Sequence, residues 1–200
     1  MEFIISVPFY KCAECDFFLH TRCTKLPTRI EQHRLHYFHT LTLLQQAPNK
    51  STSMPYCHIC FRDYRGFTYK CDACAGDTFD IQCASIPETL KHEGHQHPLS
   101  LPIEHRRRDC KACSHDNQYY GFVCTSCDFV LGIRCANLPL LARHKYDTHR
   151  LKLTYTAEAS YGEYYCLICE KTRDPNHWFY YCAVCDFPAH PKCVIETTNP

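Results

Sequence analysis

The chain has 200 residues with 18 Cys and 14 His, and its formal net charge is +1. Such enrichment in cysteine indicates either a disulfide framework or a metal-binding protein. The balanced charge argues against nucleic-acid binding, because chains that contact phosphate backbones usually carry a clear basic excess. The basic run Arg106–Arg108 is flanked by acidic residues, and we interpret it as a solvated loop.

The N-terminal segment lacks the features of a secretory signal. Its apolar run around Ile4, Ile5 and Val7 is short, has no basic start, and is soon followed by Cys12. No stretch approaches the roughly 18 apolar residues that a membrane-spanning helix needs. We therefore expect an intracellular protein, cytoplasmic or nuclear, in which thiols stay reduced and paired cysteines usually bind metal.

Cysteine pairs of the form Cys-x-x-Cys divide the chain into repeats with a period of roughly 50–60 residues. From Cys57 onward a leading pair alternates with a following pair, and a lone cysteine comes after each following pair. The pairs are Cys12/Cys15, Cys57/Cys60, Cys71/Cys74, Cys110/Cys113, Cys124/Cys127, Cys166/Cys169 and Cys182/Cys185, and the lone cysteines are Cys23, Cys83, Cys135 and Cys193.

A histidine opens an alternating stretch in each complete repeat. His39, His97 and His149 each precede leucines at the second and fourth following positions. Residues at i, i+2 and i+4 of a strand share one face, so we expect strands with the histidine at the edge of a small leucine core. After the lone cysteine, Pro87 predicts the start of a short helix through Lys91, which would bring the next histidine toward the metal.

The positions of these cysteines and histidines predict four domains. Residues 1–36 form an incomplete N-terminal repeat, which lacks the opening histidine, the strand and the leading pair. Residues 37–93 and 94–146 form complete repeats, and residues 147–200 form a repeat that is incomplete at its C-terminal end.

Zinc is the metal that this pattern predicts. Zn²⁺ takes four ligands in a tetrahedron, drawn from Cys and His, and one Cys-x-x-Cys turn presents two sulfurs to one ion. A unit of roughly 50 residues buries too little apolar surface to be stable alone, whereas structural zinc supplies about 10–16 kcal/mol in finger peptides. We expect small zinc-stabilised α+β repeats, each rich in short β-hairpins, with one short helix and little other regular structure.

The order of these ligands resembles the C1 zinc finger. The His-Pro-Leu-Ser-Leu opening at His97 and the Tyr-x-Cys-x-x-Cys-Asp-Phe segment from Tyr180 to Phe187 are similar to the divergent C1 (DC1) domain of plant cysteine/histidine-rich proteins. The resemblance covers essentially the whole chain. It implies C1-like fingers with about two structural zinc ions per complete repeat, held by interleaved ligands.

In the first kind of site, the resemblance implies that the opening His and the following pair bind one ion with a trailing His. On this chain these sets are His39, Cys71, Cys74 and His92; His97, Cys124, Cys127 and His144; and His149, Cys182 and Cys185, where no trailing His follows. In the second kind, the leading pair, an inner His and the lone Cys bind the other ion. These sets are Cys57, Cys60, Asp80 and Cys83; Cys110, Cys113 and Cys135; and Cys166, Cys169, His190 and Cys193. In the N-terminal repeat, Cys12, Cys15 and His33 form a set.

Two repeats lack the inner histidine. Asp80 stands three residues before Cys83, and carboxylate is an accepted zinc ligand, so we predict Asp80 as the fourth ligand. Gly132 has no donor side chain, so water or His115 would complete its site, or the site is weak. Histidines outside the repeated offsets, among them His36 and His95, are expected to be ordinary surface or loop residues. His36 could nevertheless replace His39, which is three residues away.

The predicted function is a protein-interaction or signalling module with structural zinc. Seven equivalent pairs argue against a thioredoxin-like site, and no Ser-His-Asp set, phosphate loop or HExxH motif points to an enzyme. A redox-active protein-disulfide reductase remains an alternative. Binding of diacylglycerol-type membrane lipids is another, since the C1 family includes such sensors, but the corresponding segments here lack the Gln-Gly pair of their lipid loop.

Overall fold

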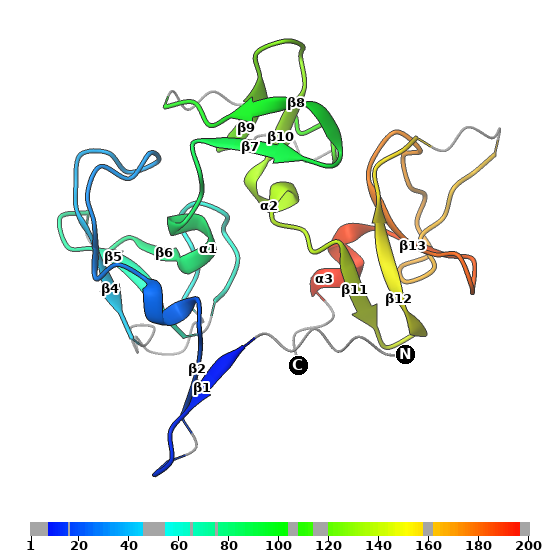
Figure 1. The fold of residues 1–200 in the computed structure, drawn as a ribbon. Coiled ribbons are helices and arrows are strands. Elements are labelled where there is room, and N and C mark those ends of the chain that lie inside the picture. The colour runs from blue at the N-terminus through cyan, green and yellow to red at the C-terminus, as the bar shows by residue number, and fades with distance from the viewer. Residues whose placement is uncertain are drawn as a thin grey trace. The chain divides into compact units, whose positions relative to one another are not determined.

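The computed structural model describes residues 8–15, 17–45, 55–64, 66–74, 76–103, 108–113, 120–157 and 162–196. The chain divides into two compact units, Met1–Ala84 and Ser85–Pro200. In chain order the elements are β1 (Phe9–Lys11), β2 (Phe18–His20), η1 (Cys23–Lys25), β3 (Arg29–Ile30), β4 (Leu41–Leu44), β5 (Thr68–Cys71), β6 (Thr78–Asp80), α1 (Ile81–Ala84), β7 (Thr89–His92), β8 (His95–Ser100), β9 (Gly121–Cys124), β10 (Val130–Gly132), α2 (Ile133–Ala136), β11 (Leu141–His144), β12 (Asp147–Thr154), β13 (Phe179–Cys182), β14 (Phe187–Ala189) and α3 (Pro191–Glu196) (Figure 1).

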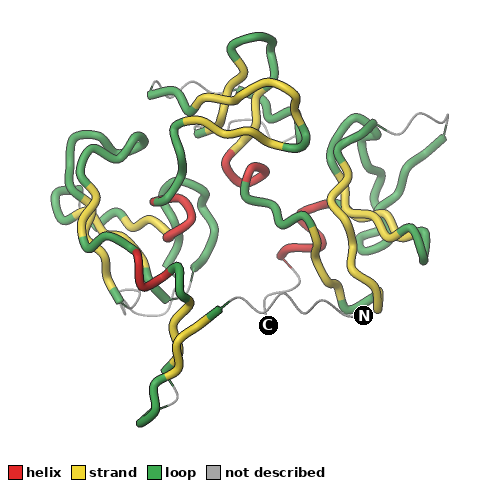
Figure 2. The backbone as a smooth tube through the Cα atoms, in the orientation of Figure 1, coloured by secondary structure: helices red, strands yellow, loops and turns green. Residues whose placement is uncertain are grey.

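The same small motif occurs three times along the described chain. Four antiparallel strands follow one another as a meander, in the sheets β3-β4-β5-β6, β7-β8-β9-β10 and β11-β12-β13-β14. A helix of one or two turns, α1, α2 or α3, comes directly after the last strand of each sheet (Figure 2). The N-terminal hairpin β1-β2 with η1 has the order of the second half of this motif.

The predicted leucine strands lie in the second position of each sheet. Leu41 in β4, Leu99 in β8 and Leu151 in β12 are all fully buried, as the alternation of polar and apolar residues requires. Tyr69 and Tyr180 are buried in the third strands. Each core therefore consists of a few residues, which leaves most of the stability of the motif to other interactions.

Buried tyrosines also fix the chain that enters two of the sheets. The hydroxyl of Tyr69 donates a 2.7 Å hydrogen bond to the Pro27 carbonyl, and that of Tyr180 donates a 2.6 Å bond to the Pro139 carbonyl. The second repeat has Phe122 at the same position, which has no hydroxyl. The Leu-Pro dipeptide thus marks the entry to a sheet and is held to its third strand.

The helix predicted from Pro87 through Lys91 is wrong. This segment contains β7, which pairs with β8 through a hairpin in which Leu90 lies opposite Leu99 and His92 opposite His95. The helix occurs earlier, as α1, and carries the lone cysteine Cys83. Cross-strand pairing with β8 outweighs the preference of Pro87 for a helix start, which is a weak local signal.

The predicted domain boundaries lie within hairpins. The boundary at 93/94 falls in the turn between β7 and β8, and the boundary at 146/147 falls between β11 and β12. The first strand of each of these two sheets therefore comes from the segment that the sequence analysis placed at the end of the preceding repeat.

Candidate metal centres

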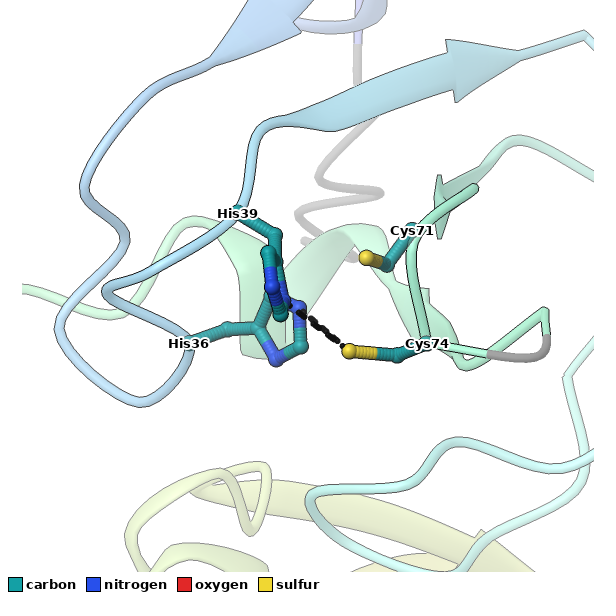
Figure 3. Close-up of side chains that lie close together, drawn as sticks. All are labelled: His36, His39, Cys71 and Cys74. Carbon is teal, nitrogen blue, oxygen red and sulfur yellow. Dashed lines mark hydrogen bonds between the residues drawn. The ribbon is translucent and has the colours of Figure 1, made fainter.

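The turn before β4 brings two histidines to the following cysteine pair of the first sheet. Nδ1 of His39 lies 3.0 Å from Sγ of Cys74, and Nε2 of His36 lies 3.6 Å from the same sulfur (Figure 3). Cys71, at the end of β5, completes the group. The ring of His36 also packs on Phe79, with ring centroids 5.1 Å apart. Two nitrogens and two sulfurs thus converge on one point.

The second sheet repeats this group at the start of β8. Nε2 of His95 and Nδ1 of His97 lie 3.6 and 3.9 Å from Sγ of Cys127, and Cys124 is the fourth member. The His95 ring stacks on Phe129 with 4.0 Å between centroids, which fixes its orientation. His95 and His97 are two residues apart in one strand, so their side chains leave it on the same side.

In the third sheet a carboxylate takes the place of the first histidine. Asp147, His149, Cys182 and Cys185 form the group. Nδ1 of His149 lies 3.1 Å from Sγ of Cys185, and Oδ1 of Asp147 lies 3.4 Å from that sulfur. A hydrogen bond from the His149 amide lowers the pKa of Asp147, while desolvation and the Asp147 carboxylate raise the pKa of Cys185 to about 11.

The histidines expected as trailing ligands have a different environment. The structure places His36 and His95 where the sequence analysis placed His92 and His144, and Asp147 supplies the third group with a fourth donor. His33, His92 and His144 instead lie across the hairpin turn from these three residues.

Each of these three turn histidines stabilises its own hairpin. Nδ1 accepts a backbone hydrogen bond from the residue two positions on, at 3.3 Å for His33, 3.0 Å for His92 and 3.3 Å for His144. Desolvation lowers the pKa of all three rings, so burial favours the neutral form that can accept such a bond. Their role in the structure is to close the turn that presents the side chains of these three groups.

Asp80 joins the leading pair and the lone cysteine of the first complete repeat. Cys60 Sγ donates to Oδ2 of Asp80 at 3.2 Å, and the Cys83 amide donates to Oδ1 at 2.8 Å. Cys57 is the fourth member of the group. Hydrogen bonds from Cys57 and Cys83 lower the pKa of Cys60 to about 4, and desolvation raises the pKa of Asp80.

His190 occupies the same place in the last repeat. Its Nδ1 lies 3.4 Å from Sγ of Cys169 and 3.9 Å from Sγ of Cys193, and its amide donates to Cys166 Sγ at 3.3 Å. Desolvation raises the pKa of Cys193 to about 12 and lowers that of His190. Three sulfurs and one nitrogen therefore meet here.

The middle repeat brings three sulfurs together without a side chain at the inner position. Sγ of Cys135 lies 3.3 Å from Sγ of Cys113, and the Gly132 amide donates to Cys110 Sγ at 3.2 Å. Hydrogen bonds from Cys113 and Cys135 lower the pKa of Cys110 to about 2. His115, the suggested extra donor, lies outside the described residues.

The N-terminal hairpin contains two incomplete groups of possible metal ligands. Cys12 accepts a bond from the Glu14 amide at 3.5 Å, and this bond, with that from Cys15, lowers its pKa. Nδ1 of His20 lies 4.0 Å from Sγ of Cys23. His33, predicted to join Cys12 and Cys15, is buried in the turn that leads to β4, where Cys57 acts on its pKa.

The donor geometry fits tetrahedral zinc. With Zn–S of about 2.3 Å and Zn–N of about 2.0–2.1 Å, tetrahedral geometry separates two sulfurs by about 3.8 Å and a sulfur from a nitrogen by about 3.6 Å. In the five groups with four side-chain donors, all ligand atoms lie within 4.8 Å of one another. All 18 cysteines lie in the described residues, and none of them forms a disulfide. The clusters therefore suit zinc coordination.

Comparison with known families agrees with this arrangement. A family model described as the C1 domain matches residues 93–136 and 144–194. These two adjacent stretches are therefore C1-like cysteine/histidine-rich domains. Neither the curated proteins nor the solved structures gave a significant match. Among the described residues, no helix is both long and apolar enough to cross a membrane.

Sequence reasoning did not group His95 or Asp147 with the following cysteine pairs, and it considered His36 only as a replacement for His39. His95 and Asp147 each stand two residues before an opening histidine, and His36 stands three before His39. Both spacings are visible in the sequence, and on a strand the spacing of two, as for His95 and Asp147, places both side chains on one face. The turn histidines repeat at equally regular offsets, so periodicity alone could not decide which histidine binds metal.

Proposed function

We propose that this chain is a tandem zinc-finger protein of the divergent C1 type, whose zinc is structural and whose surface binds other proteins. The observation that supports it is the donor set: five groups in the described chain each combine four protein side chains. A zinc ion with four protein ligands has no position left for substrate, which is typical of structural sites. On this ground we propose that the chain is not an enzyme.

Interleaving explains why such zinc would be structural. In the first complete repeat, Cys71 and Cys74 lie between Cys60 and Cys83 in the chain, yet they belong to a different group. Each ion would join segments that are distant in sequence, and the small leucine core does not need to hold them together by itself. The proposal places the protein in the cytoplasm or nucleus, where free thiols persist.

The aromatic residues of one segment argue against insertion into a membrane. The segment that corresponds to the lipid loop in the last repeat contains Trp178 and Phe179, which are only 4% and 5% exposed. Side chains that insert into a bilayer interface must be exposed before they bind. We therefore propose protein binding as the function and treat binding of diacylglycerol-type lipids as the second candidate.

Two measurements test this proposal. Elemental analysis of the reduced full chain should give at least five zinc ions, and affinity capture should recover a partner whose binding is lost when zinc is chelated. Vesicles with and without diacylglycerol serve as the competing probe. A chain without zinc would contradict the structural proposal, and zinc-dependent sedimentation with diacylglycerol vesicles would replace protein binding by lipid binding.

A further inference from the structure

The N-terminal hairpin differs from the other three copies of its motif in what lies beside its first strand. β5, β9 and β13 each pair with a strand on both sides, and one of those two neighbours is the leucine strand β4, β8 or β12. β1 precedes the same kind of cysteine pair, but among the described strands it pairs with β2 alone. In the described chain, the hairpin therefore lacks the leucine strand that completes the sheet elsewhere.

Without this neighbour the hairpin has no core. Tyr10, Tyr69 and Tyr180 each stand two residues before equivalent cysteine pairs. Tyr69 and Tyr180 are fully buried, whereas Tyr10 is 61% exposed. A leucine of the neighbouring strand lies opposite each buried tyrosine, Leu43 in the first sheet and Leu153 in the third. No described residue of β1, β2 or η1 is buried, and a two-stranded hairpin of this kind is only marginally stable in water.

The leucine strand also supplies metal donors in the complete sheets. In the first sheet, His39 stands two residues before the first leucine, and its Nδ1 lies 3.0 Å from Sγ of Cys74. A second donor, His36, comes just before it and belongs to the same group. Cys12 and Cys15 belong to none of the five groups with four side-chain donors. A strand beside β1 would therefore bring both the missing core residues and the missing donors.

The turn of this cysteine pair has the form that the metal groups use. The Glu14 amide donates to Cys12 Sγ at 3.5 Å, as the Ser126 amide donates to Cys124 Sγ at 3.3 Å in the second sheet. Cys15 is exposed, so a donor from outside the hairpin can approach it. The two cysteines are thus arranged as in a metal group, and they remain accessible.

We propose that this hairpin binds an extended segment of another polypeptide, which adds as a strand beside β1 and has the pattern His-x-Leu-x-Leu with a second histidine two residues earlier. The proposal deepens the proposed protein binding and rests on the proposed structural zinc. Strand addition gives affinity through main-chain hydrogen bonds and selects the side chains at alternate positions. In this sequence the pattern His-x-Leu-x-Leu occurs only at His39, His97 and His149, and all three stretches already lie in sheets.

The complete sheets define the register of the added strand. In the first sheet, the two leucines of the pattern lie opposite Cys71 and Tyr69 of β5. The residues of β1 at the corresponding positions are Cys12 and Tyr10. The leucines of the bound segment would therefore cover Tyr10, and its two histidines would reach the turn and hold one zinc ion with Cys12 and Cys15.

A peptide from the second sheet of this chain tests the proposal. The capped and labelled segment 94–101, which has two histidines and two leucines in the required pattern, is added to the reduced, zinc-loaded full chain. Fluorescence anisotropy should show saturable binding of one peptide per chain, and elemental analysis should show one zinc ion more than without peptide. With both histidines replaced by alanine, the peptide should bind at least about 10-fold more weakly, since even loss of a ligand's hydrogen-bond partner costs about 10–100-fold.

Variants of the chain locate the peptide. Cys15→Ser should weaken binding as much as the alanine peptide does, whereas Cys185→Ser, at the equivalent cysteine of the third sheet, should bind as the parent does. Tyr10→Ser should also weaken binding. Its control is Phe38→Ser, because Phe38 is an aromatic residue outside the hairpin that is 88% exposed. If the peptide does not bind the parent, or binds Cys15→Ser equally well, the proposal is wrong.

The zinc count separates this inference from the function on which it rests. If the chain alone binds no zinc, the proposal of structural zinc fails. If it binds zinc at the groups with four donors and the peptide adds none, the inference alone fails. If the chain instead associates with itself in sedimentation, and Cys15→Ser abolishes that association, a second copy is the occupant and the inference is again wrong.

Discussion

The Asp80 group and the Gly132 group have the same arrangement of three cysteines, but only the Asp80 group has a fourth donor among the residues that the structure describes. Both have a leading pair, a last strand and a short helix with the lone cysteine. In the first, the carboxylate contacts Cys60 at 3.2 Å and the Cys83 amide at 2.8 Å. In the second, the sulfurs of Cys135 and Cys113 are 3.3 Å apart and the Gly132 amide donates to Cys110 Sγ at 3.2 Å. The backbone thus positions the three cysteines in both groups, and the side chain at the inner position determines whether it supplies a fourth donor.

Removing all metal should have the largest effect, because it affects the Asp80 group and the Gly132 group alike. Both groups lie in sheets with very small cores, so a metal chelator under reducing conditions should abolish cooperative folding. Circular dichroism during thermal melting would show the loss of the transition. A metal-free, reduced sample that still melts cooperatively would mean that neither group is needed for folding.

Removing the carboxylate of the Asp80 group makes it resemble the Gly132 group, and this should weaken zinc binding at that one site. Asp80→Ala leaves three thiols, and we expect zinc affinity there to fall by more than the 10–100-fold that loss of a second-shell partner costs. Asp80→His should retain zinc, since the last repeat uses His190. Competition with a coloured chelator measures the release.

Two control variants make the Asp80 result specific. Asp77→Ala removes a nearby carboxylate that contacts His58 at 3.4 Å, and it should keep zinc. Asp80→Asn retains an oxygen that can accept from the Cys83 amide but is a poor zinc ligand, so it should behave like Asp80→Ala. Equal retention of zinc in Asp80→Asn and the parent would show that the amide contact, and not coordination, is the role of this residue.

Adding a donor to the Gly132 group should have a smaller effect, and it should strengthen zinc binding there. Gly132→His supplies the donor that the second group lacks, and the backbone there accepts a side chain. We expect slower zinc release from this group and a melting temperature that rises by a few degrees, as about 1 kcal/mol produces in a domain of this size. Gly162→His, at a glycine with open space around it, is the control for adding a histidine. An unchanged release rate would contradict the view that the group is one donor short.

The comparison also shows what the sequence could and could not predict. Asp80 was predicted because its offset from Cys83 equals that of His190 from Cys193, and the structure places it beside Cys57, Cys60 and Cys83. The leucine strands were predicted from their alternation. The turn histidines were assigned to metal from the resemblance to the divergent C1 domain, and they recur as regularly as the histidines that lie beside the cysteines. Which of two regular histidines faces the sulfurs depends on the hairpin between β7 and β8, and the sequence analysis predicted a helix there. The predicted helix agreed with the assignment of His92, whereas the cysteine sets did not depend on it.

The smallest expected effect is a change in the fluorescence emission of Trp178, the only tryptophan in the sequence. The amide of Trp178 donates to the Ala112 carbonyl at 3.1 Å, between Cys110 and Cys113 of the Gly132 group. Its ring stacks on His92 at 5.0 Å between centroids, and a Cβ on Gly94 would lie 2.4 Å from it. Trp178 thus packs against two turns of the middle repeat that both lead to metal-binding residues.

Loss of metal from the Gly132 group should therefore be visible in the emission of Trp178. In Cys113→Ser the turn around Ala112 should loosen, water should reach the ring, and the emission should move to longer wavelength. Cys60→Ser removes a thiol from the Asp80 group, in the other compact unit, and should leave the emission unchanged. Because the natural Gly132 group lacks a donor, mild chelation should produce the same shift before the four-donor groups release zinc. If the emission of Cys113→Ser equals that of the natural chain, the Gly132 group and the last repeat are not coupled through Trp178.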